Sequence, residues 1–309
     1  MGRTFVFAIA FLLILSCVNT IPKHMNLEPS QRFYYSDNDF LNYEIRGSGK
    51  ITLIFLHGFA ASLRNWDDVI KNLPENIFTS YLVDLKGSGL SSKPRDSHYS
   101  IKDNTELIIK FIKHNNLKNY TIIGHSMGGA IALFSYLSLA DDPQFKPKKL
   151  ILLDPAAYKT EIPFFVQYLR IPILSAPLYY LTSPEYKSEY TLRRLVYDQK
   201  KINPEIINRY AIFMHEAGYG YALMQTAAEI IPDNIEQYVS RYRSITSPVL
   251  VIWGKEDPAI PLSSGQRLVN DLPNAKLHVI EKCGHNAHEE YPEEVAELIR
   301  SFMEYSESQ

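Results

Sequence analysis

Residues 120–139 read YTIIGHSMGGAIALFSYLSL, and this stretch decides the fold. The apolar run at 120–123 predicts a strand, and the spacing of apolar residues over 128–139 predicts a helix. The turn between them has the pattern Gly-x-Ser-x-Gly, in which a serine on a sharp strand-to-helix turn exposes its hydroxyl group. Gly124 and Gly128 suit this turn because so tight a bend leaves no space for larger side chains. This context favours Ser126 as a nucleophile over a serine that merely lies in a glycine-rich turn.

Strands and helices alternate on both sides of this stretch. Nearly continuous apolar runs are typical of strands that are buried on both faces of a sheet. Such runs lie at residues 51–56, 79–83, 149–153, 249–253 and 276–280, helical spacing occurs at 67–73, 102–114, 262–272 and 293–302, and a hairpin is indicated at 32–44. The alternation predicts an α/β fold with a parallel sheet and helices on both of its faces.

The interval between the strands predicted at 149–153 and 249–253 is too long for a simple connection. Residues 156–234 contain 13 of the 38 aromatic residues and several short helical stretches separated by proline. A loop of this length without secondary structure would be unusual in a compact domain. We therefore predict a helical cap at 156–234, inserted into a core formed by 31–155 and 235–309. Most of its aromatic side chains would pack within the cap, and some would face the active site.

A serine hydroxyl group becomes a good nucleophile only with a base within hydrogen-bond reach. His285 follows the last predicted strand in a glycine-containing loop, which would bring its imidazole over the strand ends. His288, three residues further on, is the alternative base. We expect Ser126 and His285 to form the pair of nucleophile and base.

The base needs a carboxylate that fixes its tautomer and stabilises its charged form. Asp257 comes shortly after the strand at 249–253, so it can reach the same edge of the sheet. The chain order Ser, Asp, His is also the order expected with this type of nucleophile turn. Two alternatives stay open. Glu256 is adjacent but would point away if Asp257 points inward, and Asp154 ends the strand that follows the nucleophile helix.

The tetrahedral intermediate of acyl transfer carries a negative oxygen, which two backbone amides can stabilise. Met127 follows the nucleophile at the start of a helix, where amides are free and the helix dipole is positive. The second amide should come from the loop after the strand at 51–56, and Phe59 is the best candidate. His57 is expected to brace this loop rather than to take part in catalysis.

Together these motifs resemble the α/β-hydrolase superfamily, in particular its capped esterase, monoacylglycerol lipase and C–C hydrolase branches. The resemblance runs from about residue 30 to 304. It rests on His57-Gly-Phe59, Gly87-Ser-Gly-Leu-Ser91, Gly124-His-Ser-Met-Gly-Gly129, Trp253-Gly-Lys-Glu-Asp257 and Cys283-Gly-His285. It implies an eight-stranded, mostly parallel sheet and no cofactor. The family's Asp-x-x-Gly-x-Gly loop is present at residues 84–89, and we expect it to be structural.

The same resemblance narrows the chemistry. An aspartate in place of Ser126 would indicate a dehalogenase or an epoxide hydrolase, and the proline iminopeptidase relatives typically carry Trp where this chain has Met127. We expect hydrolysis of carboxylic esters, with lipid-like or short-to-medium acyl groups, through an acyl-enzyme on Ser126. A hydrolase of C–C bonds in vinylogous diketones is the alternative. A non-catalytic binding protein with the same fold is the alternative from another class.

The composition is that of an ordinary globular protein, with 46% hydrophobic residues and a formal net charge of −2. No run of five or more like charges occurs, so nothing indicates a nucleic acid or another highly charged partner. The expected partner is a small ester or lipid molecule, and the oligomeric state is left open.

The chain has two cysteines, Cys17 and Cys283. Two are too few for a cysteine-based structural zinc site, and no metal ion is expected. If Cys17 is removed or lipidated, Cys283 has no partner for an intramolecular disulfide. We expect Cys283 to be a buried packing residue and not a thiol nucleophile.

Residues 1–17 resemble an export signal. One arginine precedes an apolar run at 5–15 that is too short to span a bilayer and has the length of a secretory signal. The run ends at Ile14-Leu-Ser-Cys17, which resembles a bacterial lipobox and implies lipidation of Cys17. The alternatives are cleavage elsewhere before Pro22 and an uncleaved amphipathic or membrane-embedded terminus. With a tether at 18–30, we predict an exported protein of the periplasm or cell envelope, attached to the membrane through its N-terminus.

Overall fold

A computed structural model of the chain describes residues 30–159, 161–232 and 234–304. The predicted signal, Cys17 and nearly all of the tether lie outside these ranges, so export, lipidation and membrane attachment stay predictions. In the part of the chain that is described, no helix is both long enough and apolar enough to cross a membrane.

The centre of the protein is one eight-stranded sheet with the order β1-β2-β4-β3-β5-β6-β7-β8. The pairs from β4 through β8 are parallel, whereas β2 is antiparallel to both β1 and β4. The strands are β1 (Gln31–Tyr34), β2 (Phe40–Arg46), β3 (Ile51–Leu56), β4 (Phe78–Val83), β5 (Tyr120–His125), β6 (Lys149–Leu153), β7 (Val249–Gly254) and β8 (Ala275–Ile280). The predicted fold class and the hairpin at its start are confirmed.

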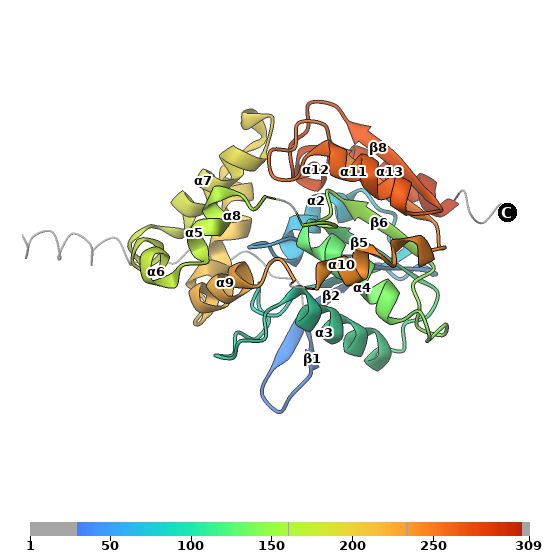
Figure 1. Ribbon diagram of the computed structural model, residues 1–309, viewed down its shortest axis with the longest axis horizontal. Helices are drawn as coiled ribbons and strands as arrows, with labels where there is room; N and C mark the ends of the chain where they lie inside the picture. Colours follow the sequence, from blue (N-terminus) through green and yellow to red (C-terminus); the bar gives the residue numbers. More distant parts are fainter. Residues whose placement is uncertain (1–29, 160, 233, 305–309) are drawn as a thin grey trace, which may run out of the picture.

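Helices cover both faces of the sheet, as Figure 1 shows. One face packs against α3 (Ile101–His114), α4 (Met127–Ser138), α10 (Ile235–Val239) and α11 (Leu262–Asp271). The other packs against η1 (Leu63–Trp66), α2 (Asp67–Lys71), α12 (Ala287–Glu290) and α13 (Pro292–Glu304). A short helix, η4 (Tyr242–Ser244), precedes β7.

The apolar runs of the sequence are explained by burial on both faces of the sheet. Along β3, Leu53 and Phe55 belong to the cluster beneath α2 and α13, while Ile54 and Leu56 belong to the cluster beneath α3 and α4. All four side chains are fully buried. Full burial of such a side chain contributes about 1.5–3 kcal/mol, so a polar residue would be costly at any of these four positions.

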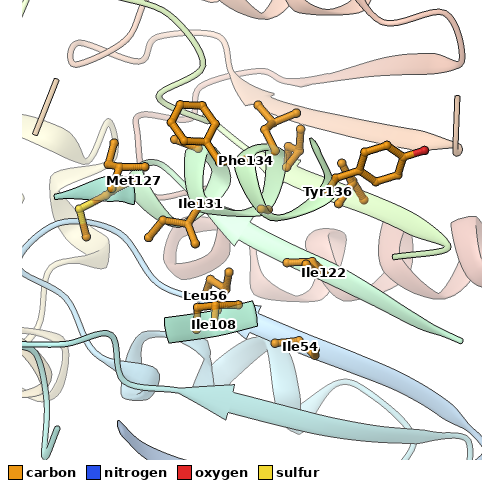
Figure 2. Close-up of a cluster of buried hydrophobic side chains, with 14 of the residues drawn as sticks. Ile54, Leu56, Ile108, Ile122, Met127, Ile131, Phe134 and Tyr136 are labelled. Atoms are coloured by element: carbon orange, nitrogen blue, oxygen red, sulfur yellow. The ribbon is translucent and has the colours of Figure 1, made fainter. Parts of the chain in front are cut away.

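Helix α4 lies in the interior, and this is why its sequence is apolar on every side. Every residue from Met127 to Leu137 is buried. Figure 2 shows Ile131 and Phe134 of α4 in one cluster with Ile122 of β5 and Ile108 of α3. The helix that begins at the predicted nucleophile is therefore held by the core along its length.

Most of the chain between β6 and β7 forms short helices. We call those from α5 to α9, with the 3-10 helices among them, the inserted helices. In Figure 1 they stand apart from the sheet, on the left of the view. They are α5 (Phe164–Leu169), α6 (Pro172–Leu181), α7 (Pro184–Leu195), η2 (Gln199–Lys201), α8 (Pro204–Ala211), η3 (Ile212–His215) and α9 (Tyr219–Ala228). Ser183 and Asn203 cap α7 and α8, each followed by a proline that cannot donate a helical hydrogen bond. The division into core and cap at residues 156 and 234 stays a prediction.

Candidate active site

Ser126 occupies a strained turn between β5 and α4. Its φ is +51° and its ψ is −115°, a region that non-glycine residues rarely adopt. A Cβ atom added at Gly124 would lie 2.4 Å from the Gly128 carbonyl oxygen, and one added at Gly128 would lie 2.3 Å from the Leu56 carbonyl oxygen. Both glycines are therefore required by space, as the sequence pattern predicts. Backbone strain of this kind costs about 1–3 kcal/mol and persists only where the surroundings enforce it.

Main-chain hydrogen bonds enforce the turn. The Ser126 amide donates to the Leu153 carbonyl oxygen at 2.9 Å, which ties the turn to the end of β6. The Ser126 carbonyl oxygen accepts from the amides of Gly129, Ala130 and Ala156 at 3.0, 3.2 and 3.0 Å. The position of the serine is thus set by β6, by the first turn of α4 and by the chain that leaves β6.

The structure brings His285 and Asp257 together. His285 Nδ1 donates to Asp257 Oδ2 at 2.7 Å. The second oxygen, Oδ1, accepts from the amides of Ala259 and Ile260 at 2.7 and 3.0 Å, so the carboxylate is fixed in orientation. Because Nδ1 carries the proton of the neutral imidazole, Nε2 is left as the proton acceptor. The His285 amide donates to the Leu195 carbonyl oxygen at 2.8 Å, so the inserted helices also hold this loop.

Ser126 and His285 line the same cavity. It contains about 1070 Å³ of empty space, part of which is open to solvent. Side chains of the core form one side, including Phe59, Ala156 and Ile260. The inserted helices and their flanking loops form the other with Phe165, Val166, Leu192, Leu195, Met214, Ile230 and Ile231. None of the described residues that line the cavity is a lysine or an arginine.

The two amides predicted to form the oxyanion hole belong to residues near Ser126. A Cβ atom added at Gly58 would lie 3.2 Å from Ser126 Cβ, so the loop that carries Phe59 is next to the serine. Met127 is the first residue of α4. Neither the Phe59 nor the Met127 amide donates a hydrogen bond to any group in the described ranges, so both are free to bind a substrate oxygen.

His57 braces this loop, as predicted. Its Nε2 accepts from the Leu85 amide at 3.0 Å, and its Nδ1 donates to the Gly58 carbonyl oxygen at 2.8 Å. Burial lowers the pKa of His57, which keeps the ring neutral in this role. The loop at 84–89 is structural in the same sense, because Asp84 accepts from Asn42 Nδ2 and from the Leu63 and Leu90 amides at 2.8–2.9 Å.

The alternative base, His288, lies away from the cavity. Its ring packs against the rings of His125 and Trp66, with centroids 4.4 and 4.8 Å apart, and only 1% of the residue is exposed. Burial lowers the pKa of His288 to about 3, so it does not carry a proton near neutral pH.

Glu256 and Cys283 support the structure around the site rather than its chemistry. Glu256 Oε2 accepts from the Cys283 amide at 3.0 Å, so this carboxylate is occupied away from His285. Cys283 is fully buried in the cluster beneath α13. Burial raises the pKa of its thiol, which opposes formation of a thiolate and supports the packing role.

Asp154, the remaining alternative, lies close to the candidate pair. It directly follows β6, with φ at +42°, and its Oδ1 accepts from the Gly254 amide at 2.9 Å. One carboxyl oxygen each from Asp154 and Asp257 and a ring nitrogen of His285 all lie within 4.8 Å of one another. Burial, and then the charge of Asp257, raise the pKa of Asp154 well above its usual value.

Asp154, Asp257 and His285 are residue types that can also bind a metal ion. The geometry of Asp257 and His285, however, is that of a hydrogen-bonded pair. His285 Nδ1 and Asp257 Oδ2 are 2.7 Å apart. An ion bound to both atoms would sit about 2.0–2.2 Å from each and would usually hold them further apart than this. Asp257 Oδ1 is already occupied by two amides. These residues therefore do not fit a metal centre.

Sequence reasoning missed Glu290, which joins the base loop to the inserted helices. Its Oε1 accepts from the Gly284 amide at 2.8 Å, and its Oε2 accepts from the amides of Tyr197 and Asp198 at 3.0 and 3.2 Å. The glutamate thus holds both the residue before His285 and the chain after α7. No pattern in the sequence marks this role because its partners are main-chain amides.

A model of the alpha/beta hydrolase family matches residues 53–298. Similar proteins include the uncharacterized hydrolase YugF of Bacillus subtilis, 27% identical over 281 residues that cover 90% of this chain and 98% of that protein. A 2-hydroxy-6-oxononadienedioate/2-hydroxy-6-oxononatrienedioate hydrolase of Paraburkholderia phymatum is 27% identical, with 85% and 90% covered. The monoacylglycerol lipase ABHD6 of Mus musculus is 28% identical, with 87% and 81% covered.

Proposed function

The chain is a hydrolase of the alpha/beta hydrolase family, and within this family we propose that it is a serine hydrolase of carboxylic esters with apolar acyl groups. The observation that carries this proposal is the cavity itself. Ser126 and an oriented His285 open onto a space with mainly apolar walls, and no lysine or arginine lines it in the described part of the chain.

The first half of the reaction forms an acyl-enzyme. Ser126 Oγ attacks the ester carbonyl carbon while His285 Nε2 takes the hydroxyl proton, and Asp257 stabilises the resulting imidazolium. The amides of Phe59 and Met127 bind the negative oxygen of the tetrahedral intermediate. The C–O bond to the alcohol then breaks, and His285 returns its proton to the departing alkoxide oxygen.

The second half releases the acid. A water molecule gives one proton to His285 Nε2 as its oxygen attacks the acyl carbon, and the same two amides bind the new oxyanion. The bond to Ser126 Oγ breaks, the serine recovers its proton from His285, and the carboxylic acid leaves. Ester and water become alcohol and acid, and the enzyme returns to its starting state.

The walls of the cavity favour esters over the substrates named for the Paraburkholderia relative. A dienedioate carries two carboxylates, and taking them out of water without a cationic partner is costly. Here the polar side chains of the cavity include those of Tyr158, Ser188 and Tyr210, and Glu161, which also lines it, is acidic. An apolar acyl chain has no such cost and gains free energy as it leaves water.

The test compares the two substrate classes on one protein. We expect turnover of p-nitrophenyl butyrate and octanoate, with kcat/KM well above that for 2-hydroxy-6-oxononadienedioate. The Ser126→Ala variant should lose at least about 10⁴-fold in kcat toward the esters. Ester turnover that survives this substitution would exclude the proposed nucleophile. A kcat/KM that is higher for the dienedioate would support the C–C hydrolase instead.

A further inference from the structure

Two carboxyl groups are buried around one imidazole, although the proposed reaction uses only one of them. The side chain of Asp257 and the whole of Asp154 are fully buried. They come from different strand ends, Asp154 from β6 and Asp257 from the loop after β7, and the sheet brings their oxygens within 4.8 Å of each other. Asp257 accepts three hydrogen bonds, two on Oδ1 and one on Oδ2, which support its negative charge and leave room for one more donor at Oδ2.

Asp154 has no such set. Its Oδ1 accepts one hydrogen bond from the Gly254 amide, and its buried Oδ2 has no donor opposite it in the described structure. The titratable groups around Asp154 are Asp257, the His285 ring, the Cys283 thiol and, more weakly, Glu290, and none of them is a lysine or an arginine. A second carboxylate in this place would lack a counter-charge, and two adjacent buried carboxyl groups avoid that cost when one of them keeps a proton.

We propose that Asp154 is a positioning residue whose carboxyl group stays protonated at neutral pH and donates a hydrogen bond from Oδ2 to the Asp257 carboxylate. The raised pKa of Asp154, caused first by burial and then by the charge of Asp257, agrees with this arrangement. A neutral neighbour fixes the Asp257 carboxylate without placing a second negative charge beside His285. Asp154 thus fixes the orientation of Asp257, which in turn orients His285.

If Asp154 keeps its proton in the folded protein, the free energy of unfolding must depend on pH, and this can be measured without an assay of activity. Between the ordinary pKa of an aspartate and the raised value, the folded chain holds a proton that the unfolded chain releases. The native state is therefore stabilised at low pH and loses stability as pH rises through this window. In Asp154→Asn this linkage is absent. The ratio of the two unfolding constants, wild type over variant, should rise about tenfold per pH unit.

Urea unfolding of the full chain from pH 5 to 8 measures this ratio. Asp154→Asn is a fair replacement, because asparagine tolerates a positive φ and its amide can donate in place of the carboxylic proton. Glu281→Gln, an exposed carboxylate, is the control for loss of a negative charge from the surface. A ratio that stays constant over this range, or that falls with pH, would show that Asp154 is ionised in the folded protein and would overturn the proposal.

A second measurement rests on the proposed function and reads the effect on His285. Because asparagine keeps a donor toward Asp257, kcat/KM of Asp154→Asn and the acid limb of its pH profile should stay within about threefold of wild type. Asp154→Ala removes the donor and should lower kcat about tenfold, the equivalent of one hydrogen bond to a charged group. If Asp154 were ionised, its replacement by asparagine would instead move the acid limb to lower pH. Absence of ester turnover in the wild type would reject the proposed function, while the unfolding experiment would still decide the role of Asp154.

Discussion

The sheet with its covering helices and the inserted helices bury apolar side chains to very different degrees. Strands β3, β5, β6 and β7 have almost no exposed side chain. Nine of the twelve exposed large hydrophobic residues of the described chain lie between residues 164 and 197: Phe164, Ile171, Ile173, Leu174, Tyr180, Leu181, Tyr186, Tyr190 and Tyr197. The first region is fixed by dense packing, whereas the second keeps only its inner side in contact with the protein.

The two regions also contribute differently to the candidate site. Ser126, Asp257 and His285 all follow strands of the sheet, so their positions depend on packing in the core. The inserted helices supply one wall of the cavity and a few polar contacts to the base loop, such as the hydrogen bond from the His285 amide to Leu195. We infer that the core determines the chemistry and that the inserted helices determine which substrates fit the cavity. The comparison can be tested by changing each region separately.

The largest effect is expected for Asp257→Asn. Asparagine keeps the shape but presents a neutral group to His285, so the ring loses both its preferred tautomer and the stabilisation of its charged form. We expect kcat to fall by about 10⁴-fold. The urea midpoint should change little, because the variant keeps an oxygen for the amides of Ala259 and Ile260. A kcat within tenfold of wild type would mean that Asp257 is not the carboxylate that orients His285.

Acid should destabilise the core through His288. Since its folded pKa is about 3 and an unfolded histidine has a pKa near 6.5, the unfolded chain binds a proton that the folded chain does not. Stability is therefore lost as pH falls from 6.5 toward 3, by up to about 5 kcal/mol. His288→Leu removes this contribution and should lose less stability than wild type between pH 7 and pH 4. Equal losses in the two proteins, measured by urea unfolding, would contradict the buried neutral ring.

Packing should matter far more in the core than on the outer side of the inserted helices. Phe134 is fully buried in α4, and Phe134→Ala should cost about 3–5 kcal/mol. Ile173 is 84% exposed on α6, and Ile173→Ala should change stability by less than about 0.5 kcal/mol. Urea unfolding gives both values. Similar costs for the two variants would remove the distinction between the regions.

The smallest of the functional effects is expected where the two regions meet. Glu290→Gln keeps one acceptor oxygen, so either the Gly284 amide or the amides of Tyr197 and Asp198 lose their partner. We expect a loss of about 1–3 kcal/mol in stability. A several-fold fall in kcat should accompany it, since the His285 loop is less firmly held. Glu205→Gln on α8, whose carboxylate is largely exposed, is the matched control. A fully active Glu290→Gln would show that the base loop does not depend on this contact.

The sequence predicted the core well because its signals are local and repeated. Residues 51–56 and 149–153 coincide with β3 and β6, because strands buried on both faces give nearly continuous apolar runs whose limits are easy to locate. The turn at Ser126 was predicted because its Gly-x-Ser-x-Gly pattern is local, although only Gly124 is required by a neighbour in sequence, the Gly128 carbonyl oxygen, whereas Gly128 is required by the distant Leu56 carbonyl oxygen. The structure also brings His285 and Asp257 together as the chain order indicated.

Other features could not be predicted because they depend on contacts between distant segments. Helix α12 has four residues, fewer than any periodic pattern needs, and its limits are set by packing against α2 and α13. The bounds of the inserted helices depend on proline and capping residues in a stretch where outward-facing residues are apolar too. The contact of Asp154 with Asp257 arises only when β6 and β7 pair, and no spacing in the sequence shows it.

Covalent labelling tests the central claim most directly, namely that the core activates Ser126 through His285. The full chain is treated with an alkyl fluorophosphonate, and the adduct is located and its rate of formation followed by mass spectrometry. We predict one adduct, on the peptide that contains Ser126, with a rate at least about 100-fold lower in His285→Gln. An adduct on another residue, or equal rates in His285→Gln and wild type, would contradict the account.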